Sequence, residues 1–487
     1  MPPGLSGSAP TTRLTAADYA RVNELTRESI QHIQKKDYDR AEAAIEKALS
    51  ILPHHAVNLY NMACLKALRG RSDEAMEYLE RAALEGFTDF IHIEKDPDLI
   101  SLRDLPRFRE LLSRKDELQR RAAGRVLAWL KRELGGGYIF DLDEKHKLVF
   151  ATNIDARTLA SLKQRLVAQA RSLCEQLFEH EPDQYISVVI PSPEDFRQIV
   201  RRPGVGGFYN HENRLIIAKG LGQTITHEFT HALHDADRAR AGQVHPVWLT
   251  EGLATLFESA RFVEETFVPQ DNYRLGHVQT AARSNRLIPL AKLLTMDHAA
   301  FLQNAMLAYA QSGSILHYLY DSGLLRRFYD TYKAMYDKDR TGRLALEKTT
   351  GWPLEQIERD WKAWVLKRKV PTINTAPDSA VLGVRFGAST YGCMIEEVVP
   401  SGPAEKAGLK AGDIIVAFGG QEVTDQQSIL QMLAAQKPGD RVIVTVRREG
   451  GDMDVPVVLG RRDRLAPATT RPATRPAARQ ALPAARP

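Results

Sequence analysis

The apolar positions of residues 15–118 recur with two superimposed periods. Within each segment they follow the three- and four-residue spacing of an amphipathic helix. The helices in turn repeat after 34 residues, because Ala41 and Ala75, Ile45 and Leu79, and Ala48 and Ala82 are each 34 apart. Two helix pairs are evident, and residues 96–112 indicate a degenerate third pair. The pattern predicts an all-α repeat domain over residues 15–118.

The pattern changes in residues 119–370, where short apolar runs alternate with helical segments. Helices are expected at 125–134 and 156–179, and strands at 138–140, 147–150 and 185–190, followed by a hairpin over 206–218. From Glu251 to Trp364 the pattern is mainly helical. We expect a domain that joins a small mixed sheet to a helical part.

Beyond residue 370 the chain divides into three pieces. A linker is expected over 371–378 and a small, mainly β domain over 379–460. Residues 461–487 consist mostly of Ala, Pro, Arg and Thr. Such a composition cannot bury a core, so a disordered tail is predicted there, and residues 1–14 are also expected to be disordered. The predicted fold class is therefore a multidomain α+β chain.

Two of these domains resemble known modules. The 34-residue helical repeat resembles tetratricopeptide repeats, which implies either a concave peptide-binding groove or a cover for the neighbouring domain. The segment from Val398 to Ile415 is similar to the PDZ domains of bacterial proteases. The resemblance implies that a peptide C-terminus adds to a sheet edge there. The corresponding carboxylate-binding loop would be Leu382, Gly383, Val384, Arg385 and Phe386. On the helix expected at 426–435, Ile429 and Leu433 either line that groove or belong to the core.

Composition and charge limit the classes of partner and the cellular compartments expected for this chain. A length of 487 residues corresponds to about three domains, and a net charge of +5, much of it in the tail, gives no reason to expect nucleic-acid binding. The three cysteines are too few and too far apart for a disulfide framework. No apolar stretch reaches the roughly 18 residues of a membrane span. The N-terminus lacks the apolar core of a signal peptide, which favours a soluble, cytoplasmic protein, with the cell envelope as the alternative if the natural start lies upstream.

The segment from His227 to His231 carries the clearest chemistry. It reads H-E-x-x-H, and positions four apart share one face of a helix, so two imidazoles can reach one metal ion. Glu228 can then take a proton from a metal-bound water. Such a short pattern also arises by accident. Glu251, however, follows His231 by 20 residues, and two His with one Glu are an established ligand set for catalytic zinc.

The frame W-L-x-E-G-x-x-x-x-x-E that contains Glu251 resembles the gluzincin metallopeptidases, especially the aminopeptidase-N-like branch. The resemblance implies a zinc cofactor held by His227, His231 and Glu251, with Glu228 as general base and a zincin-like fold. Two features of this sequence depart from the gluzincin pattern. No G-x-M-E-N segment, which captures the substrate's free amine in that branch, precedes the motif. Thr255 stands where thermolysin-like enzymes have a supporting Asp.

The sequence suggests two further parts of the site, an oxyanion donor and a substrate-binding strand, and each has an alternative interpretation. Tyr309 lies 58 residues after Glu251, near the place where aminopeptidase-N-like enzymes carry a Tyr, and could stabilise the oxyanion; His317 is the alternative. Either residue could instead be part of a packed core. The hairpin at 206–218 could pair with an extended substrate or be an ordinary sheet edge.

The preferred function is a zinc-dependent peptidase, an endopeptidase rather than an aminopeptidase, that recognises polypeptides through its two modules. Protein C-termini are expected at the PDZ groove and a protein partner at the repeat groove. A non-catalytic adaptor that retains the metal fold is the alternative. A zinc hydrolase acting on something other than protein is the third hypothesis.

Overall fold

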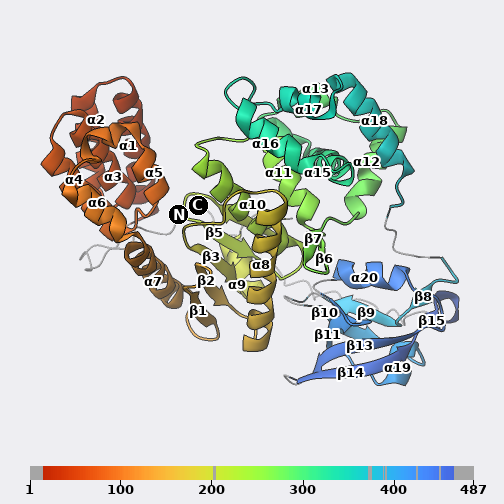
Figure 1. Cartoon of the computed structure of the whole chain (residues 1–487). Coiled ribbons are helices and arrows are strands. Elements are labelled where there is room, and N and C mark those ends of the chain that lie inside the picture. Colours follow the sequence, from red (N-terminus) through yellow and green to blue (C-terminus); the bar gives the residue numbers. More distant parts are fainter. Residues whose placement is uncertain are drawn as a thin grey trace, which may run out of the picture. The chain divides into compact units, whose positions relative to one another are not determined.

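The computed structural model describes residues 15–200, 205–370, 376–387, 389, 392–423, 426–448 and 451–465. The segment 1–14, most of the predicted linker and the predicted tail beyond residue 465 lie outside these residues. The chain divides into two compact units, Met1–Pro371 and Thr372–Pro487 (Figure 1). The first contains the helical repeats and a region of sheet and helices, and the second is a small unit rich in strands.

The repeats form two helix pairs. They comprise α1 (Ala16–Gln34) with α2 (Tyr38–Ile51) and α3 (Ala56–Leu68) with α4 (Ser72–Glu85). The alanines at 34-residue spacing are fully buried, because only a small side chain lets paired helices approach this closely. Instead of a third pair, the structure has α5 (Phe90–Lys95), the 3₁₀ helix η1 (Pro97–Leu102) and α6 (Pro106–Ser113). Pro97 and Pro106 each stand at the start of a new helix, where a missing N–H is tolerated, so the chain breaks into short turns.

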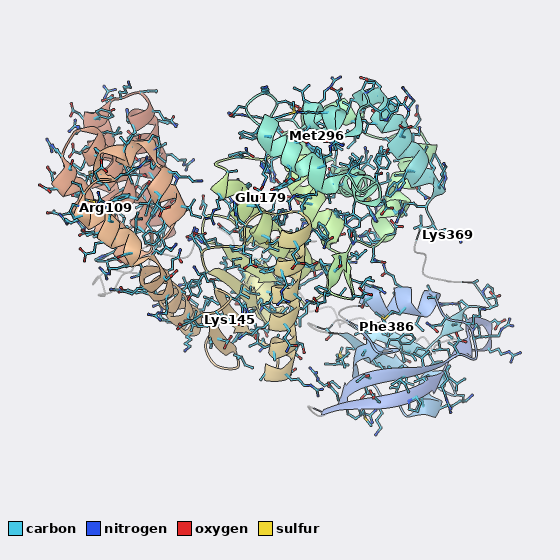
Figure 2. The ribbon with its side chains drawn as sticks, in the orientation of Figure 1. Arg109, Lys145, Glu179, Met296, Lys369 and Phe386 are labelled. Carbon is cyan, nitrogen blue, oxygen red and sulfur yellow. The ribbon has the colours of Figure 1, made fainter. Side chains whose placement is uncertain are left out.

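A five-stranded sheet follows the long helix α7 (Lys115–Leu134). Its order is β1 (Ile139–Asp143), β2 (Leu148–Thr152), β3 (Ile186–Ile190), β5 (Leu215–Ala218) and β4 (Gly207–Asn210). Lys145, labelled in Figure 2, lies in the charged turn between β1 and β2. Strands β2, β3 and β5 are parallel, whereas β1 and β4 are antiparallel to their neighbours and form the two edges. The hairpin predicted at 206–218 is therefore an edge hairpin of this sheet.

Helices cover both faces of the sheet. Val149 and Leu215 pack with Ala123 and Leu130 of α7 and with α9 (Pro193–Ile199). On the opposite face, Lys163 of α8 (Ala156–Gln176) lies over Phe150 of β2. Helix α10 (Gln223–Arg240) is on the α8 face, because a Cβ added to Gly207 would meet its Thr224. The sheet therefore separates α7 from the helix that carries the H-E-x-x-H motif.

The rest of the first unit is mainly helical, as predicted. Its helices are α11 (Val247–Phe257), α12 (Tyr273–Arg283), α13 (Leu290–Leu293), α14 (His298–Gln303), α15 (Ala305–Asp321), α16 (Leu325–Met335), α17 (Arg343–Thr350) and α18 (Leu354–Lys367). A small hairpin, β6 (Arg261–Val263) with β7 (Thr266–Val268), interrupts them. Glu264 supplies the left-handed residue that its tight turn needs, with φ of 55°. Trp248 and Trp361 are fully buried in this part.

The second unit is mainly β. Its elements are β8 (Ala380–Val381), β9 (Val384–Gly387), β10 (Cys393–Val398), α19 (Pro403–Ala407), β11 (Ile414–Phe418), β12 (Gln421–Glu422), α20 (Gln426–Ala434), β13 (Arg441–Arg448), β14 (Gly451–Val458), β15 (Gly460–Arg461) and η2 (Arg462–Arg464). The prediction of a disordered tail from residue 461 is wrong at its start, because Arg461 pairs with Ala380 across the β15–β8 ladder. This pairing joins the two ends of the unit, and composition alone could not indicate it.

Two expectations from the sequence concern membrane spans and cysteine pairing. None of the helices in the described parts of the chain is both long and apolar enough to cross a bilayer. All three cysteines lie in the described part of the chain and none forms a disulfide there; Cys64 and Cys393 are buried.

Asp413 anchors the second unit. Its carboxylate is buried and accepts hydrogen bonds from Arg448 Nε and Nη2, both at 2.7 Å, and from the Lys410 amide at 2.8 Å. Burial by itself raises the pKa of Asp413, but these hydrogen bonds outweigh it and hold the pKa below its usual value. The ionised form therefore stabilises the fold at neutral pH, and this stabilisation is lost as pH falls through the lowered pKa.

We expect Asp413→Asn to lower the unfolding free energy of this unit by about 2 kcal/mol, less than for a fully buried pair because Arg448 is partly exposed. Hydrogen exchange of residues 393–448 within the full chain measures this, and the variant should lose less stability on acidification than the wild type. Glu396→Gln is the control, since that carboxylate belongs to an exposed pair with Arg385 and should change little. Equal effects of the two substitutions would contradict the assignment.

Candidate metal site

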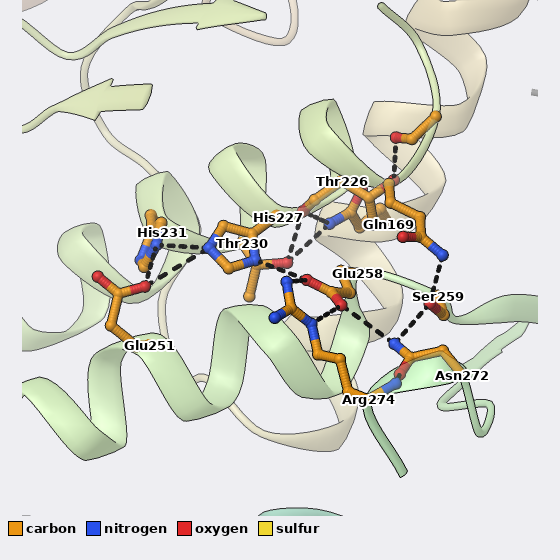
Figure 3. A network of polar contacts seen from close by, with 12 residues as sticks. Gln169, Thr226, His227, Thr230, His231, Glu251, Glu258, Ser259, Asn272 and Arg274 are labelled. Atoms are coloured by element: carbon orange, nitrogen blue, oxygen red, sulfur yellow. Dashed lines mark hydrogen bonds and ion pairs between the residues drawn. The ribbon is translucent and has the colours of Figure 1, made fainter. Parts of the chain in front are cut away.

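Helix α10 presents its two histidines on one face. His227 and His231 are one turn apart, and their Nε2 atoms lie 3.2 Å from each other. The α10 backbone is held from α8, because Gln169 Nε2 donates to the Thr226 carbonyl at 3.2 Å and to Thr230 Oγ1 at 3.1 Å. Figure 3 shows this bracing beside the histidines. The helix that carries the motif is thus held in place by α8.

Glu251 brings a carboxylate to the same point from α11. Its Oε2 lies 3.5 Å from His227 Nε2 and 3.3 Å from His231 Nε2 (Figure 3). Together with the 3.2 Å between the imidazoles, these distances describe a nearly equilateral triangle. A tetrahedral zinc with ligands at about 2.0–2.1 Å needs ligand atoms about 3.3–3.4 Å apart. The three donor atoms therefore fit one such ion without rearrangement.

The charges of these three residues, called the cluster below, also suit a bound cation. Glu251 Oε2 is buried and accepts no well-formed hydrogen bond from any described residue. Burial raises the pKa of Glu251, but His231 and His227 outweigh it and keep the carboxyl ionised. Burial likewise lowers the pKa of His227, whereas its contacts with Glu251 and Glu258 raise it to about 10. Without a metal, a proton on the imidazole supplies the positive charge that the carboxylates require.

A second carboxylate, Glu258, orients His227. Its Oε2 lies 3.2 Å from His227 Nδ1, so that Nε2 faces Glu251. Asn272 Nδ2 donates to Glu258 Oε1 at 3.0 Å, and Arg274 donates to both carboxylate oxygens at 2.5 and 3.2 Å. Such outer partners fix the ring orientation and the tautomer of a metal-binding histidine. Figure 3 shows the chain of contacts from Glu251 to Arg274.

Glu258 was not predicted as a site residue, although it is the last residue of the W-L-x-E-G-x-x-x-x-x-E frame. The available signal was its spacing, because seven residues are two helical turns and place Glu258 on the same face as Glu251. Thr255 stands where thermolysin-like enzymes have a supporting Asp. Here it packs against α15 instead. A Cβ added to Gly313 would meet the Thr255 side chain at 2.7 Å. The supporting carboxylate thus comes from one turn further along the chain.

Helices α11 and α15 cross closely because both carry glycine at the contact. A Cβ on Gly252 would lie 2.9 Å from Leu316 and 3.1 Å from Ser312. This approach places Tyr309 beside the cluster, with its ring 6.3 Å from that of His227. Burial and the nearby carboxylates of Glu251 and Glu228 raise the pKa of Tyr309, so its hydroxyl stays protonated and able to donate.

Glu228 is buried next to the first histidine. Among the described residues, none forms a hydrogen bond with its carboxylate, which leaves both oxygens able to accept. His317, by contrast, belongs to a different group, with Asp271 at 3.5 Å and Asp321 at 3.6 Å from its ring nitrogens. Of the two alternatives for the oxyanion, the structure brings Tyr309 to the cluster.

A buried histidine pair ties α10 to the loop before α11. His234 Nε2 and His245 Nδ1 are 2.8 Å apart, and His245 Nε2 lies 3.1 Å from Gln243 Oε1. Burial lowers the pKa of both rings, so they remain neutral and one donates to the other. This contact limits the movement of α11, and hence of Glu251, relative to the histidines.

The predicted PDZ loop lines a groove of about 300 Å³ in the second unit. Leu382, Gly383, Val384, Arg385 and Phe386 all border it, together with Leu430, Leu433 and Leu465. Of the two residues left open on α20, both belong to the core, and Leu433 also lines the groove. Gly383 has φ of 78°, which favours glycine. Strand β9 is an edge of its sheet, as strand addition requires.

Comparison with known families supports two of the modules. Family models match residues 380–459 as a PDZ domain, residues 32–93 as a tetratricopeptide repeat, and residues 222–338 as "Protein of unknown function (DUF1570)". The chain contains tetratricopeptide repeats and a PDZ domain. The third match spans the whole cluster from His227 to Tyr309 but carries no functional description.

Similar curated proteins match over a stretch the length of a PDZ domain. A probable periplasmic serine endoprotease DegP-like of Chlamydia trachomatis serovar D is 39% identical over 69 residues, which is 14% of each chain. The serine protease HTRA1 of Xenopus tropicalis is 42% identical over 72 residues, or 15% of each chain. The chain thus spans only about one seventh of the length of these relatives.

The similar solved structures have lower sequence identity to this chain. An HtrA3 PDZ domain bound to a phage-derived ligand is 22% identical, with a TM-score of 0.15, and covers 16% of this chain and 84% of that chain. An aminopeptidase N family protein from Idiomarina loihiensis is 15% identical, with a TM-score of 0.24, and covers 66% of this chain and 67% of that one. Overlaps at this level do not define a shared fold for the central region.

We expect the purified chain to bind one zinc ion, and Glu258→Gln to weaken zinc affinity about 10- to 100-fold, because the His227 ring loses its orienting carboxylate. Competition with a chromophoric chelator measures the affinity. Glu265→Gln, an exposed carboxylate in the β6–β7 turn, is the matched control and should not change it. An unaltered affinity in a folded Glu258→Gln protein would show that Glu258 does not support the site.

Proposed function

We propose that this protein is a zinc-dependent peptidase with two protein-recognition modules. The observation that carries the proposal is the convergence of His227 Nε2, His231 Nε2 and Glu251 Oε2 within 3.2–3.5 Å of one another. Two His and one Glu form a catalytic zinc set that leaves a coordination position open for substrate or water. The gluzincin-like frame around Glu251 supports the same assignment.

A zinc ion at this position would activate water and polarise a scissile carbonyl. Glu228 follows His227 directly and has no competing hydrogen bond from the described residues. It is therefore available to take the proton of the attacking water and to pass it to the leaving amine. Tyr309 remains protonated because burial and carboxylates raise its pKa, so its hydroxyl can donate to the oxyanion.

The edge strand β4 supplies a surface for an extended polypeptide. It runs along α10, with Gly207 against Thr224 and Tyr209 donating to Asp235 at 3.0 Å. In the described sheet its outer side pairs with no other strand. A substrate backbone that adds to this edge would pass beside the metal cluster. Because the sequence lacks the amine-capturing motif of aminopeptidases, we favour an endopeptidase.

The recognition modules suggest polypeptide substrates or regulators. A PDZ groove that takes a C-terminus, and repeats that bind a protein partner, would select or position chains for cleavage. The same modules also support the second candidate, a peptide-binding adaptor whose metal fold does no chemistry. The presence of a base and a protonated tyrosine around the histidine cluster favours the enzyme, since an adaptor needs neither. Hydrolysis of a substrate other than protein is the third candidate.

We expect Glu228→Gln to reduce peptide cleavage about 10²- to 10⁴-fold and to leave zinc binding intact, because it removes the base but no metal ligand. Mass spectrometry of products from a denatured protein mixture, with and without chelator, measures cleavage, and metal analysis measures zinc. Glu265→Gln should cleave like the wild type. Zinc binding without any Glu228-dependent cleavage of peptides would favour the adaptor or a substrate other than protein.

We expect Tyr309→Phe to lower kcat about 10²- to 10³-fold with little change in KM, because the lost hydrogen bond is made mainly in the transition state. Steady-state kinetics on a cleaved peptide separate the two parameters. Tyr273→Phe is the control, since Tyr273 is exposed at the start of α12. A rise in KM with unchanged kcat would assign Tyr309 to substrate binding instead.

A further inference from the structure

One side chain contacts both the partner of a candidate metal ligand and the candidate oxyanion donor. Arg274, near the start of α12, donates to the two carboxylate oxygens of Glu258, which in turn orients His227 (Figure 3). The central carbon of its guanidinium lies 5.7 Å from the centroid of the Tyr309 ring. Arg274 therefore contacts parts of the site that come from two elements, the end of α11 and α15.

The Tyr309 ring is bordered by groups of different kinds. Phe301 meets it edge to face, with ring centroids 5.1 Å apart, and the ring of His227 lies 6.3 Å away. The third neighbour is the Arg274 guanidinium, and a cation over an aromatic face is attracted by the negative potential of the ring. A tyrosine side chain has only two torsions, so a contact that holds the ring also fixes the direction of its hydroxyl.

Glu258 fixes the plane of this guanidinium. Two N–H groups of Arg274 donate to the two oxygens of the carboxylate, at 2.5 and 3.2 Å, and such paired hydrogen bonds set the orientation of the planar group. The Glu258 side chain is only 3% exposed and that of Arg274 22%. Because a buried ion pair adds little stability compared with well-packed apolar residues, the orientation of the pair is its more informative property. The fixed plane holds the positive charge against the Tyr309 ring.

The loop that carries Arg274 is anchored by other residues. The two carboxylate oxygens of Asp271 accept hydrogen bonds from Arg368 Nε at 3.0 and 2.7 Å, and Asn272 Nδ2 donates to Ser259 Oγ at 2.9 Å. Asn272 also caps α12, because its side-chain oxygen accepts from the Arg274 amide at 2.9 Å. None of these contacts uses the Arg274 side chain, so a substitution there keeps the loop in place and isolates the effect of the guanidinium.

We propose that Arg274 is a positioning residue that holds the Tyr309 hydroxyl beside the cluster, and that it does so from the same carboxylate that orients His227. The inference rests on the proposed function and adds a link between its metal-binding and oxyanion-stabilising parts. Without this link the metal ligands keep their places, but the tyrosine ring is free to turn away from the cluster. A displacement of about 1 Å can lower a rate about 10²-fold, so a small movement of the hydroxyl is enough to affect catalysis.

Arg274→Lys tests this link in the full-length protein. Lysine keeps the positive charge that Glu258 needs, but it lacks the planar fork that pairs with both oxygens and lies against the ring at the same time. We expect zinc affinity to fall much less than in Glu258→Gln, and kcat at saturating zinc to fall about tenfold with little change in KM. In the Tyr309→Phe background the same substitution should not lower kcat further, because the hydroxyl that Arg274 positions has been removed. An equal fall of kcat in both backgrounds would show that Arg274 does not act through Tyr309.

A second measurement does not depend on activity. When the full-length protein is labelled with meta-fluorotyrosine, the fluorine NMR resonance of Tyr309 is identified by its loss in Tyr309→Phe. We expect Arg274→Lys to shift and broaden this resonance, because the ring loses a fixed neighbour. Arg283→Lys, the same change at the exposed far end of α12, is the matched control and should leave the resonance and kcat unaltered.

The two measurements separate failure of this proposal from failure of the proposed function. An unaltered Tyr309 resonance in Arg274→Lys would overturn the proposal, whatever the activity of the protein. If the wild type cleaves no peptide, the proposed function fails, and the fluorine spectrum still decides whether Arg274 holds the Tyr309 ring.

Discussion

The central region of this protein is organised around buried negative charge that needs a cation. Glu251 and Glu258 lie on one face of α11 and on either side of the His227 ring. Two carboxylates with little exposure are tolerated only when positive charge compensates them. Arg274 compensates Glu258, whereas Glu251 faces the two imidazoles and the neutral Tyr309 hydroxyl. Either a proton or a metal ion must therefore balance the negative charge of Glu251, and the spacing of the three donor atoms suits a metal ion.

Several unrelated contacts keep this arrangement in place. Gln169 of α8 holds α10, and the His234–His245 pair fixes the loop that leads to α11. The glycines of α11 and α15 let those helices approach until Tyr309 reaches the cluster. None of these residues is itself a candidate metal ligand. They act by limiting the movement of the candidate ligand side chains, which is how a site gains preorganisation.

The sheet gives its two faces different tasks. One face packs against α8 and α10 and positions the cluster, and the other packs against α7. The edge strand β4 lies along α10, where Tyr209 donates a hydrogen bond to Asp235. The PDZ groove lies in a separate unit.

The sequence by itself determined the features that follow from local periodicity and spacing. These are the helix pairs with their buried alanines, the order of strands and helices in the central region, and the four-residue spacing of His227 and His231. The PDZ module was predicted from the resemblance of residues 398–415 to that family. Only the tertiary structure decided which distant residues meet: Glu258 behind His227, Tyr309 rather than His317 at the cluster, and Arg461 paired with Ala380. Helical and strand periods fix the face on which a side chain lies, but the partner of that face depends on how closely packed elements approach. Here that approach is set by small residues and buried polar contacts far apart in the chain.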